Sequence, residues 1–393
     1  MTGFADPVPD VLAWLRALVA IPTAYPPGDT TEMAAYLHQE LSSMGYATAI
    51  HSGGPGLDNV VARLGEGSPC LVFNVHVDTV DAGDLSLWET PPLEATQRGD
   101  RIYGLGAANC KGSGAVQLWL AREIARRGGP ARGEVVFTFV ADEESLGERG
   151  TKFLADAGVI QPDMLFLGAP TDNSVTNAER GVLWVELQAT GSPAHAGQPD
   201  DGDNAILRML RVAAHLDREL SARLKNRSVD DMRSTMNLGL IRGGRNCNVV
   251  PSQCTAQLDR RLLPEESVED AYREICDLVA EAGEPDGSVE ARFLLGTNGF
   301  RSAVDGPMIS TLASTIAQVS GASTSFTSGI GVSDGRHFSD RDIEIVNFGP
   351  GDGAAGHASN ESVSLDALRQ SVAILDGMFD SLLGYAGDRA AAG

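Results

Sequence analysis

Four short apolar runs, rich in β-branched and aromatic residues, alternate with longer helical patterns along this chain of 393 residues. Runs that are apolar at successive positions are typical of strands buried on both faces, and their alternation with helices predicts an α/β fold: a mostly parallel sheet flanked by helices. The strand-like runs are LVFNVHVD (71–78), EVVFTFVAD (134–142), DMLFLGAP (163–170) and IEIVNFGPG (343–351), and the helical patterns include 114–128 and 308–321.

The segment from 181 to 294 has a different pattern. It reads as a strand, a long helix, two strands, a second helix and a last strand, at 181–191, 205–224, 236–244, 254–263, 268–282 and 288–295. This pattern predicts a compact α+β unit inserted into the first domain. We therefore expect one domain made of residues 1–180 and 295–393, and an inserted domain of residues 181–294.

The charge of the chain constrains its partners. Asp plus Glu number 53 against 30 Lys plus Arg, so the formal net charge is −23, which repels phosphate backbones and argues against a nucleic-acid partner. No window approaches the length of a membrane span, and the N-terminus has no basic region before its apolar stretch, so we expect a cytoplasmic protein. Five scattered cysteines without a CxxC pair indicate reduced thiols.

Polar side chains follow two of the strand-like runs. His76 and Asp78 are two residues apart at the end of the first run and therefore project from one face of a strand. A carboxylate behind a histidine is a common way to orient a metal ligand. The adjacent Glu143 and Glu144 end the second run. Because polar residues gather beyond the carboxyl ends of strands in such folds, these four side chains indicate a catalytic site.

Further motifs follow in a specific order: YGLGAANCKGSGA (103–115), GAPTD (168–172), SPAHAG (192–197), NVVPS (248–252), LDRRLLP (258–264), GVSDGRHF (331–338) and GHASNE (356–361). Together they resemble the M20 family of metallopeptidases and amidohydrolases over about residues 10 to 385. That family includes aminoacylases, acetylornithine and succinyl-diaminopimelate deacylases, and carboxypeptidase G2-like enzymes.

The resemblance implies a catalytic domain with a metal site and a smaller lid domain that also forms a homodimer. The His-x-Asp motif of the family matches His76 and Asp78, and its catalytic pair matches Glu143, as general base, and Glu144, as metal ligand. Its C-terminal metal histidine matches His357. These assignments are implied by the family pattern.

The same resemblance places substrate contacts in and near the inserted domain. The lid histidine that helps to bind the oxyanion, often across the dimer, matches His195, and the substrate-binding Asn and Arg match Asn248 and Arg261. Gly331 stands where the family contacts substrate through the backbone. The expected substrate is a small molecule that bears a carboxylate.

The chain departs from the family pattern at the metal site. Asn109 stands where most relatives have an Asp that bridges two metal ions, and Ala169 stands where they have an acidic ligand. Asp172 could take over the role of that ligand. Two divalent ions about 4 Å apart repel by about 16 kcal/mol at an effective dielectric constant of about 20, so shared anionic ligands are needed to hold both. An Asn supplies one neutral oxygen and a donor that a cation repels.

We therefore expect one metal ion per chain, held mainly by Glu144 and His357, with Asn109, His76 or Asp172 as additional ligands. A mixed set of nitrogen and oxygen ligands suits either zinc or manganese. The predicted activity is metal-dependent hydrolysis of a C–N bond, an amide in an N-acyl amino acid or a small peptide-like carboxylate.

Two other functions remain open at this stage. An altered, mononuclear site could deaminate an aromatic amine such as an aminobenzoate, as the M20-like aminohydrolase of 5-nitroanthranilate does. The chain could also be a catalytically impaired relative that binds a ligand without turnover, although such a protein has no physical need for a general base beside a metal.

Several of these residues also have a structural interpretation. Asn109 could be a turn residue among glycines, and Asp172 a helix cap or turn. Arg261 could form an internal ion pair with Asp259 or Asp334. Cys110 is interpreted as a buried thiol rather than a nucleophile, and His337 as a packed histidine rather than a ligand.

Overall fold

The computed structural model describes residues 6–329 and 331–388, and the chain in it divides into two compact units. The first unit comprises the chain up to Asn177, then Ser302–Thr327 and the chain from Ser333; the second comprises Ala178–Arg301 and Ser328–Val332. The chain thus crosses between units at 177/178 and 301/302, compared with the expected 180/181 and 294/295. The grouping of 328–332 with the second unit has no counterpart in the sequence prediction.

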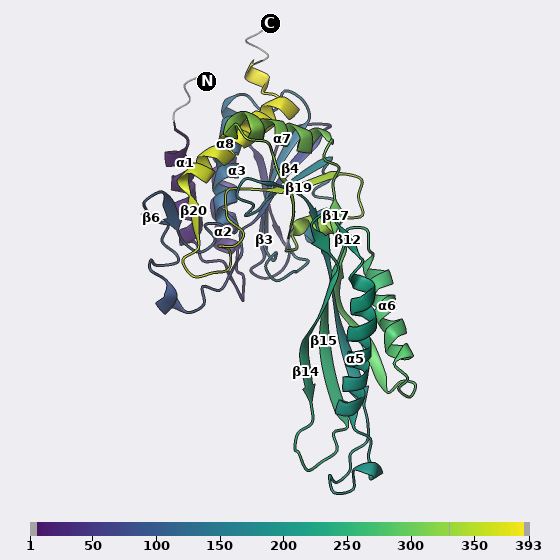
Figure 1. Cartoon of the computed structure of the whole chain (residues 1–393). Coiled ribbons are helices and arrows are strands. Elements are labelled where there is room, and N and C mark those ends of the chain that lie inside the picture. The colour runs from purple at the N-terminus through teal and green to yellow at the C-terminus, as the bar shows by residue number, and fades with distance from the viewer. Residues whose placement is uncertain (1–5, 330, 389–393) are drawn as a thin grey trace. The chain divides into compact units, whose positions relative to one another are not determined.

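The core of the first unit is a large mixed sheet with parallel strands at its centre (Figure 1). In spatial order its strands are β10 (Val175–Glu179), β19 (Glu344–Phe348), β9 (Met164–Gly168), β4 (Cys70–His76), β8 (Glu134–Val140), β3 (Asp58–Gly65) and β2 (Ala47–Ser52). The pairs β19–β9, β9–β4 and β4–β8 are parallel, and the pairs toward both edges are antiparallel. β18 (Phe326–Gly329) and β17 (Phe300–Arg301) also pair with β10.

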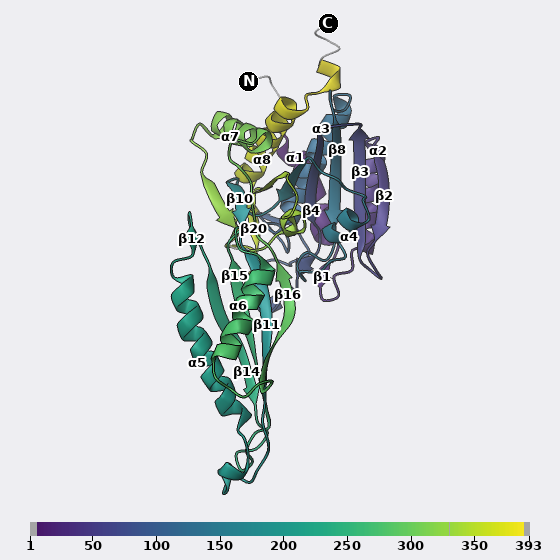
Figure 2. The same cartoon turned by 90° about the vertical axis from the view of Figure 1, so that its right-hand side faces the viewer.

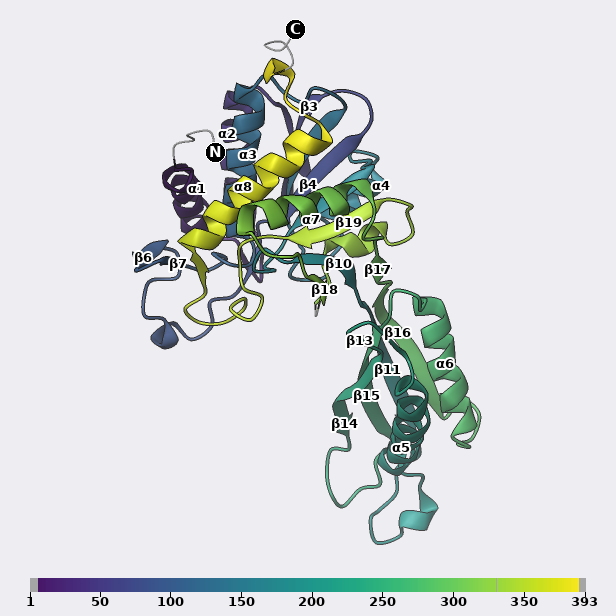
Figure 3. The same cartoon turned by 45° about the horizontal axis from the view of Figure 1, so that its top comes forward.

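The central strands are buried along almost their whole length, which explains why they read as continuous apolar runs in the sequence. Helices α1, α3 and α8 pack against one another, and α7 packs against α8, as Figure 3 shows. The helices of this unit are α1 (Val8–Ala20), α2 (Thr31–Ser43), α3 (Lys111–Arg126), α4 (Thr151–Asp156), α7 (Pro307–Ser320), α8 (Leu365–Leu382) and the 3-10 segments η1 (Leu85–Leu87) and η3 (Asp334–Phe338).

Small sheets complete the first unit. β1 (Ala24–Tyr25) pairs with β5 (Thr79–Val80), directly after the His76 strand. β7 (Arg101–Tyr103) lies between β6 (Thr96–Arg98) and β20 (Ser362–Ser364). Within the described part of the chain, no helix combines the length and the apolar character that crossing a lipid bilayer requires.

The second unit is a four-stranded antiparallel sheet with two helices on one face (Figure 2). Burial alternates along its two inner strands, as expected when helices cover only one face. The strand order is β14 (Thr235–Gly243), β15 (Gln253–Leu262), β11 (Gly181–Thr190) and β16 (Val289–Thr297); the helices are α5 (Ala205–Leu224) and α6 (Val268–Glu281), with shorter elements at β12 (Ser228–Val229), β13 (Met232–Arg233) and η2 (Pro199–Asp201).

Candidate active site

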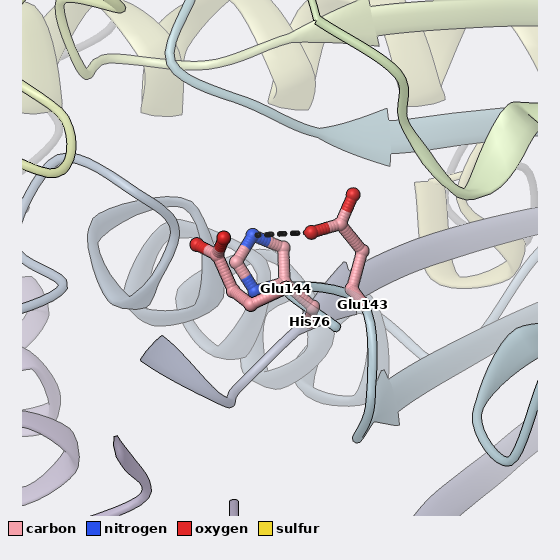
Figure 4. A group of neighbouring side chains, drawn as sticks. All are labelled: His76, Glu143 and Glu144. Carbon is pink, nitrogen blue, oxygen red and sulfur yellow. Dashed lines mark ion pairs between the residues drawn. The ribbon is translucent and has the colours of Figure 1, made fainter. Parts of the chain in front are cut away.

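Strand register brings the polar ends of β4 and β8 together. The two strands are parallel neighbours, and His76 lies opposite Val140. The chain then makes a tight turn, in which Gly147 donates to the Asp142 carbonyl, and this turn carries Glu143 and Glu144 back toward β4. A ligand-type atom of each of His76, Glu143 and Glu144 lies within 4.8 Å of the other two. Figure 4 shows the Glu143 carboxylate facing the His76 ring.

Contacts with Asp78 set the orientation of the His76 ring. Its Nδ1 lies 3.0 Å from the Asp78 carbonyl oxygen and 3.6 Å from the Asp78 carboxylate. Because a carbonyl oxygen only accepts, Nδ1 carries the proton, and Nε2 faces Glu143 at 3.9 Å. The other carboxylate oxygen of Asp78 accepts from the Glu144 backbone N–H at 3.0 Å. Asp78 therefore supports both His76 and Glu144 from behind.

The side chain of Asn109 lies between the two histidines. Its Oδ1 is 3.3 Å from His76 Nε2, and its Nδ2 donates to Glu144 Oε1 at 2.8 Å and lies 3.0 Å from His357 Nε2. His357 Nε2 is itself 2.9 Å from Glu144 Oε1. The buried Cys110 thiol donates to Asn109 Oδ1, and burial raises the pKa of this thiol to about 11. Cys110 thus remains a neutral thiol that donates to the amide oxygen, in agreement with its interpretation as a packed thiol.

The loop that carries Asn109 is fixed by main-chain contacts. One carboxylate oxygen of the buried Glu361 accepts from the N–H groups of Ala108 and Asn109 at 2.8 and 2.7 Å, and the other accepts from Gly106 at 2.8 Å. Close packing explains the Gly that follows: a Cβ atom at Gly112 would lie 2.4 Å from the Ala107 carbonyl oxygen. This clamp sets the position of the Asn109 side chain.

Burial dominates the electrostatics of Glu143. It raises the pKa of this carboxyl to about 8; Asp334 and Glu144 act in the same direction, while His76 and Arg336 oppose it. For His76, burial opposes protonation, but the neighbouring Cys110, Glu143 and Asp78 outweigh it and raise the pKa above its ordinary value.

A buried Arg that the sequence analysis did not single out lies next to Glu143. Arg336 Nη1 is 3.7 Å from Glu143 Oε1, and its Nη2 is 3.7 Å from Asp334 Oδ1. The sequence signal was present, because Arg336 lies in the GVSDGRHF motif, of which Gly331, Asp334 and His337 were interpreted but Arg336 was not. His337 is mostly buried, 3.8 Å from Asp334, and it is absent from the group of metal-competent side chains, which agrees with a packed histidine.

Asp172 is not seen to join this cluster. Its backbone, at φ 50°, donates to the Gly351 carbonyl at 2.7 Å, a turn-type contact. Across residues 6–329 and 331–388, its side chain makes no hydrogen bond or ion pair with His76, Asn109, Glu144 or His357. Its role as a metal ligand stays a prediction.

The substrate-binding residues predicted from the resemblance belong to the second unit. The exposed His195 pairs with Val249 in an isolated bridge, and Ala196 donates to the Asn248 carbonyl at 3.1 Å, so the His195 and Asn248 segments run side by side. Arg261 forms a two-pronged ion pair with Asp259 at 2.8 and 3.1 Å, one of the internal pairings considered above.

Asp259 also accepts from the Trp184 indole at 2.7 Å, so this carboxylate is shared between two partners. Gly331 is exposed and groups with the second unit. Contact of these residues with substrate stays a prediction.

Comparison with known proteins decides the family. The model of peptidase family M20/M25/M40 matches residues 72–381. The chain belongs to this family. A succinyl-diaminopimelate desuccinylase of Aromatoleum aromaticum is 29% identical over 346 residues, which cover 85% of this chain and 87% of the relative. The prediction of an M20 hydrolase acting on C–N bonds is thus confirmed.

Solved structures confirm the predicted fold class of this M20 chain. An M20 family metallo-carboxypeptidase of Sulfolobus solfataricus superposes with a TM-score of 0.77 at 17% identity, covering 95% of this chain and 99% of the other. The Bacillus subtilis YXEP protein, a dinuclear metal-binding peptidase of the M20 family, superposes with a TM-score of 0.70 at 15% identity, covering 96% of this chain and 99% of the other.

The donor atoms at the site fit a divalent cation. His76 and His357 offer imidazole nitrogens, Glu143 and Glu144 offer carboxylate oxygens, and Glu144 is common to the three-residue cluster and to the His357 pair. The Asn109 amide offers an oxygen on the His76 side and a donor on the Glu144 side. Among the described residues of this site, Glu144 is the carboxylate shared by the two groups of donors, and the side chain between His76 and His357 is the neutral amide of Asn109.

Proposed function

We propose that this M20 hydrolase cleaves an amide bond in an N-acyl amino acid or small peptide-like substrate that bears a carboxylate, with one divalent metal ion per chain. The observation that carries the proposal is the approach of His76, Glu143 and Glu144 within 4.8 Å of one another at the ends of two parallel strands. The relation to succinyl-diaminopimelate desuccinylases supports an N-acyl substrate.

Glu144 and His357 would be the main holders of the ion, with His76 Nε2 and the Asn109 oxygen as further donors. A bound divalent ion would polarise the substrate carbonyl and lower the pKa of water. The preference for one ion rests on the contacts of Asn109, because its Nδ2 donates to Glu144 Oε1 at 2.8 Å. An Asp at this position could not donate to Glu144, and its negative charge would attract cations. Zinc and manganese both suit these donors.

Glu143 would act as the general base and acid. It is held apart from its neighbours, 3.9 Å from His76 and 3.7 Å from Arg336, so both oxygens remain able to accept a proton. Its carboxylate would take the proton from the attacking water and deliver it to the departing nitrogen. Asp78 would keep His76 in the tautomer whose Nε2 is free, through the contacts at Nδ1.

The second unit would supply substrate recognition. We propose that His195 stabilises the developing oxyanion, that Asn248 and Arg261 bind the polar groups and carboxylate of the substrate, and that Gly331 contributes backbone contacts. The guanidinium of Arg261 is planar and suits a carboxylate. Binding by Arg261 would require the substrate to compete with Asp259 for Nε and Nη2, the two nitrogens that donate to this carboxylate.

We further propose a homodimer formed through β14 of the second unit. This strand is at the edge of its sheet and exposes apolar side chains on both faces, with Leu238 at 41%, Leu240 at 45% and Ile241 at 45% exposure. An exposed apolar edge strand is a natural template for pairing with another strand. Light scattering should give twice the chain mass, and Leu240→Asp with Ile241→Lys should give the chain mass.

The activity is tested with a panel containing N-succinyl-L,L-diaminopimelate, N-acetyl amino acids, dipeptides and aminobenzoates, with zinc or manganese added. Release of free amino acid from an acylated substrate, lost in Glu143→Gln, supports the proposal. Ammonia release from an aminobenzoate, with no amide cleavage, would establish the deaminase instead. Tight substrate binding without turnover would establish a binding protein.

Elemental analysis tests the number of ions. The wild type should retain one equivalent of zinc or manganese after gel filtration, and Asn109→Asp should retain up to two, since it restores an anionic oxygen between the donors. Two tightly held ions in the wild type would contradict the single-metal proposal while leaving amide hydrolysis intact.

A further inference from the structure

The environment of Glu143 differs from that of an ordinary buried carboxylate. Its side chain is 13% exposed, and the two groups that face it do so at 3.9 Å, His76 Nε2, and 3.7 Å, Arg336 Nη1. These separations are beyond hydrogen-bond length. Glu143 therefore lies between an imidazole and a guanidinium without a hydrogen bond to either.

Arg336 spans the turn on which Glu143 lies. Its Nη1 faces the Glu143 carboxylate, and its Nη2 donates to the carbonyl of Gly147 at 3.4 Å. The turn between them is closed by the hydrogen bond from Gly147 to Asp142. Arg336 is 5% exposed, and its Nη1 makes no hydrogen bond within the described residues. The Nη1 group, which has no hydrogen-bond partner among these residues, thus faces Glu143.

Asp334 anchors the Arg in turn. It is 4% exposed; its Oδ2 accepts from Thr151 at 2.7 Å and from Asn74 at 3.2 Å, and its Oδ1 lies 3.7 Å from Arg336 Nη2. Asn74 lies on β4, two residues before His76, so the anchor is built on the strand that carries the site. The position of η3 and of the Glu143 turn is therefore set by contacts with one strand, β4.

An Arg suits this position because its charge is permanent. The guanidinium does not lose its proton in proteins and its fork is rigid, so Arg336 supplies a fixed positive charge and a fixed direction. A Lys or a neutral residue would lack one or both of these. Small displacements of a reacting group cost up to about 100-fold in rate, which makes the position of Glu143 a sensitive quantity.

We propose that Arg336 is a positioning residue for Glu143: held by Asp334 and Gly147, it fixes the direction of the Glu143 carboxylate and acts on the reaction only through it. This inference rests on the proposed function, in which Glu143 is the proton carrier. It assigns no contact between Arg336 and substrate.

The first experiment compares Arg336→Gln, Arg336→Lys and the matched control Arg341→Gln. Arg341 is exposed in the same segment and stacks on the Phe338 ring, 4.7 Å from its centroid. With the panel substrate that the wild type hydrolyses, Arg336→Gln should lower kcat by about 10- to 100-fold with KM within about twofold. Arg336→Lys should recover part of the loss, and Arg341→Gln should match the wild type. An unchanged kcat in Arg336→Gln would overturn the proposal.

The second experiment measures binding without turnover. In the Glu143→Gln background, calorimetry with the same substrate should give Kd values within about twofold with and without Arg336→Gln. Weakening by tenfold or more would make Arg336 a substrate-binding residue and overturn the proposal. Metal content should be equal in both proteins, because Arg336 contacts none of the proposed ligands other than through Glu143.

Asp334→Asn provides a variant that keeps the volume of the anchor, in case Arg336→Gln does not fold. It should lower kcat in the same direction with KM unchanged, while thermal unfolding followed by circular dichroism shows a folded protein. A folded Asp334→Asn with the kcat of the wild type would also overturn the proposal. Retained amide hydrolysis in Glu143→Gln would instead refute the role of Glu143 as proton carrier, and an absence of amide cleavage by the wild type would refute the proposed function, so the failures are distinguishable.

Discussion

The two units bury charged side chains in opposite ways. In the second unit, the fully buried Arg260 lies 2.9 Å from Glu266 and 3.4 Å from Glu274, and Arg227 contacts the same two carboxylates at 3.0 and 2.8 Å. Glu266 also accepts from the Leu263 backbone at 2.9 Å. Positive and negative groups alternate at short range, and the charge of the cluster is zero.

The buried charges of the first unit are held farther apart. Arg336 lies 3.7 Å from Glu143 and 3.7 Å from Asp334, and His76 lies 3.9 Å from Glu143. Arg336 Nη1 and Asp78 Oδ1 are buried without a hydrogen bond among the described residues, and so are Nε and Nη1 of Arg260 in the second unit. Such atoms cost free energy unless a ligand or a reaction uses them.

Paired charges of the second unit stabilise the fold, whereas the more widely spaced charges around Glu143 remain available for chemistry. Each cluster is built around a buried Arg, so burial of the Arg does not distinguish them. The distance to the nearest opposite charge does, because a satisfied ion pair has no remaining capacity for a proton or a cation. Four predictions test this contrast.

The largest effect is expected for Glu143→Gln. Removal of the proton carrier should reduce kcat by about 10²- to 10⁴-fold, the usual contribution of general acid–base catalysis, with little change in unfolding. Initial rates on the hydrolysed panel substrate measure it. Glu148→Gln is the control, because Glu148 is 72% exposed in the same segment and should keep the rate. A comparable loss in both variants would show that the loop, rather than the carboxylate, is responsible.

Arg260→Met should destabilise the second unit by about 3 to 5 kcal/mol, because it leaves Glu266 and Glu274 facing each other without their buried partner. Urea unfolding followed by circular dichroism measures this change. Arg273→Met removes an exposed Arg of α6, with 67% exposure, and should change stability by less than about 1 kcal/mol. Equal losses of stability in Arg260→Met and Arg273→Met would show that the buried ion pairs contribute no more than the exposed one.

His337 predicts a pH dependence of stability in the first unit. Burial, aided by Arg336, lowers the pKa of His337 from 6.5 to about 4. The folded state then binds fewer protons than the unfolded state between these values, so stability is lost as pH falls below about 6.5 and the loss levels off below about 4, at about 3 kcal/mol. Urea titrations at pH 7.5 and 5 should show a smaller drop for His337→Phe than for the wild type. An equal drop would assign the acid sensitivity to other groups.

The smallest effect is expected at the start of α6, the helix that carries Glu274. The Ser267 hydroxyl accepts from the Asp270 N–H at 3.1 Å as the N-cap, so Ser267→Ala should cost about 1 kcal/mol. Urea unfolding curves of the same kind measure this change in the free energy of unfolding. Ser221→Ala on the exposed face of α5 should change stability by a few tenths of a kcal/mol. If Ser221→Ala matched Ser267→Ala, the cap would have no specific role.

Most elements could be predicted from the sequence where one pattern extended over many residues. The helix expected at 205–224 matches α5, and the buried runs 71–78 and 134–142 contain β4 and β8. The short strands β12, β13 and β17 had no such signal, because two-residue pairings depend on a partner that lies elsewhere in the chain.

The site was only partly readable for the same reason. The approach of His76 to Glu143 follows from strand polarity, a local property of two apolar runs. The contact of Arg336 with Glu143 depends on how η3 packs against a turn 189 positions away from it, as the contact with Gly147 shows. The direction of the Asn109 amide depends on Cys110, Glu144 and His357 together, which no sequence pattern specifies.

The hydrogen bonds of Glu361 with the 106–109 loop do not depend on which side chain stands at position 109. All three of its contacts are to backbone N–H groups, which every residue type except proline possesses. The identity of residue 109 can therefore drift without loosening the loop, and an exchange between carboxylate and amide there alters the ionic character of the centre while the scaffold stays the same.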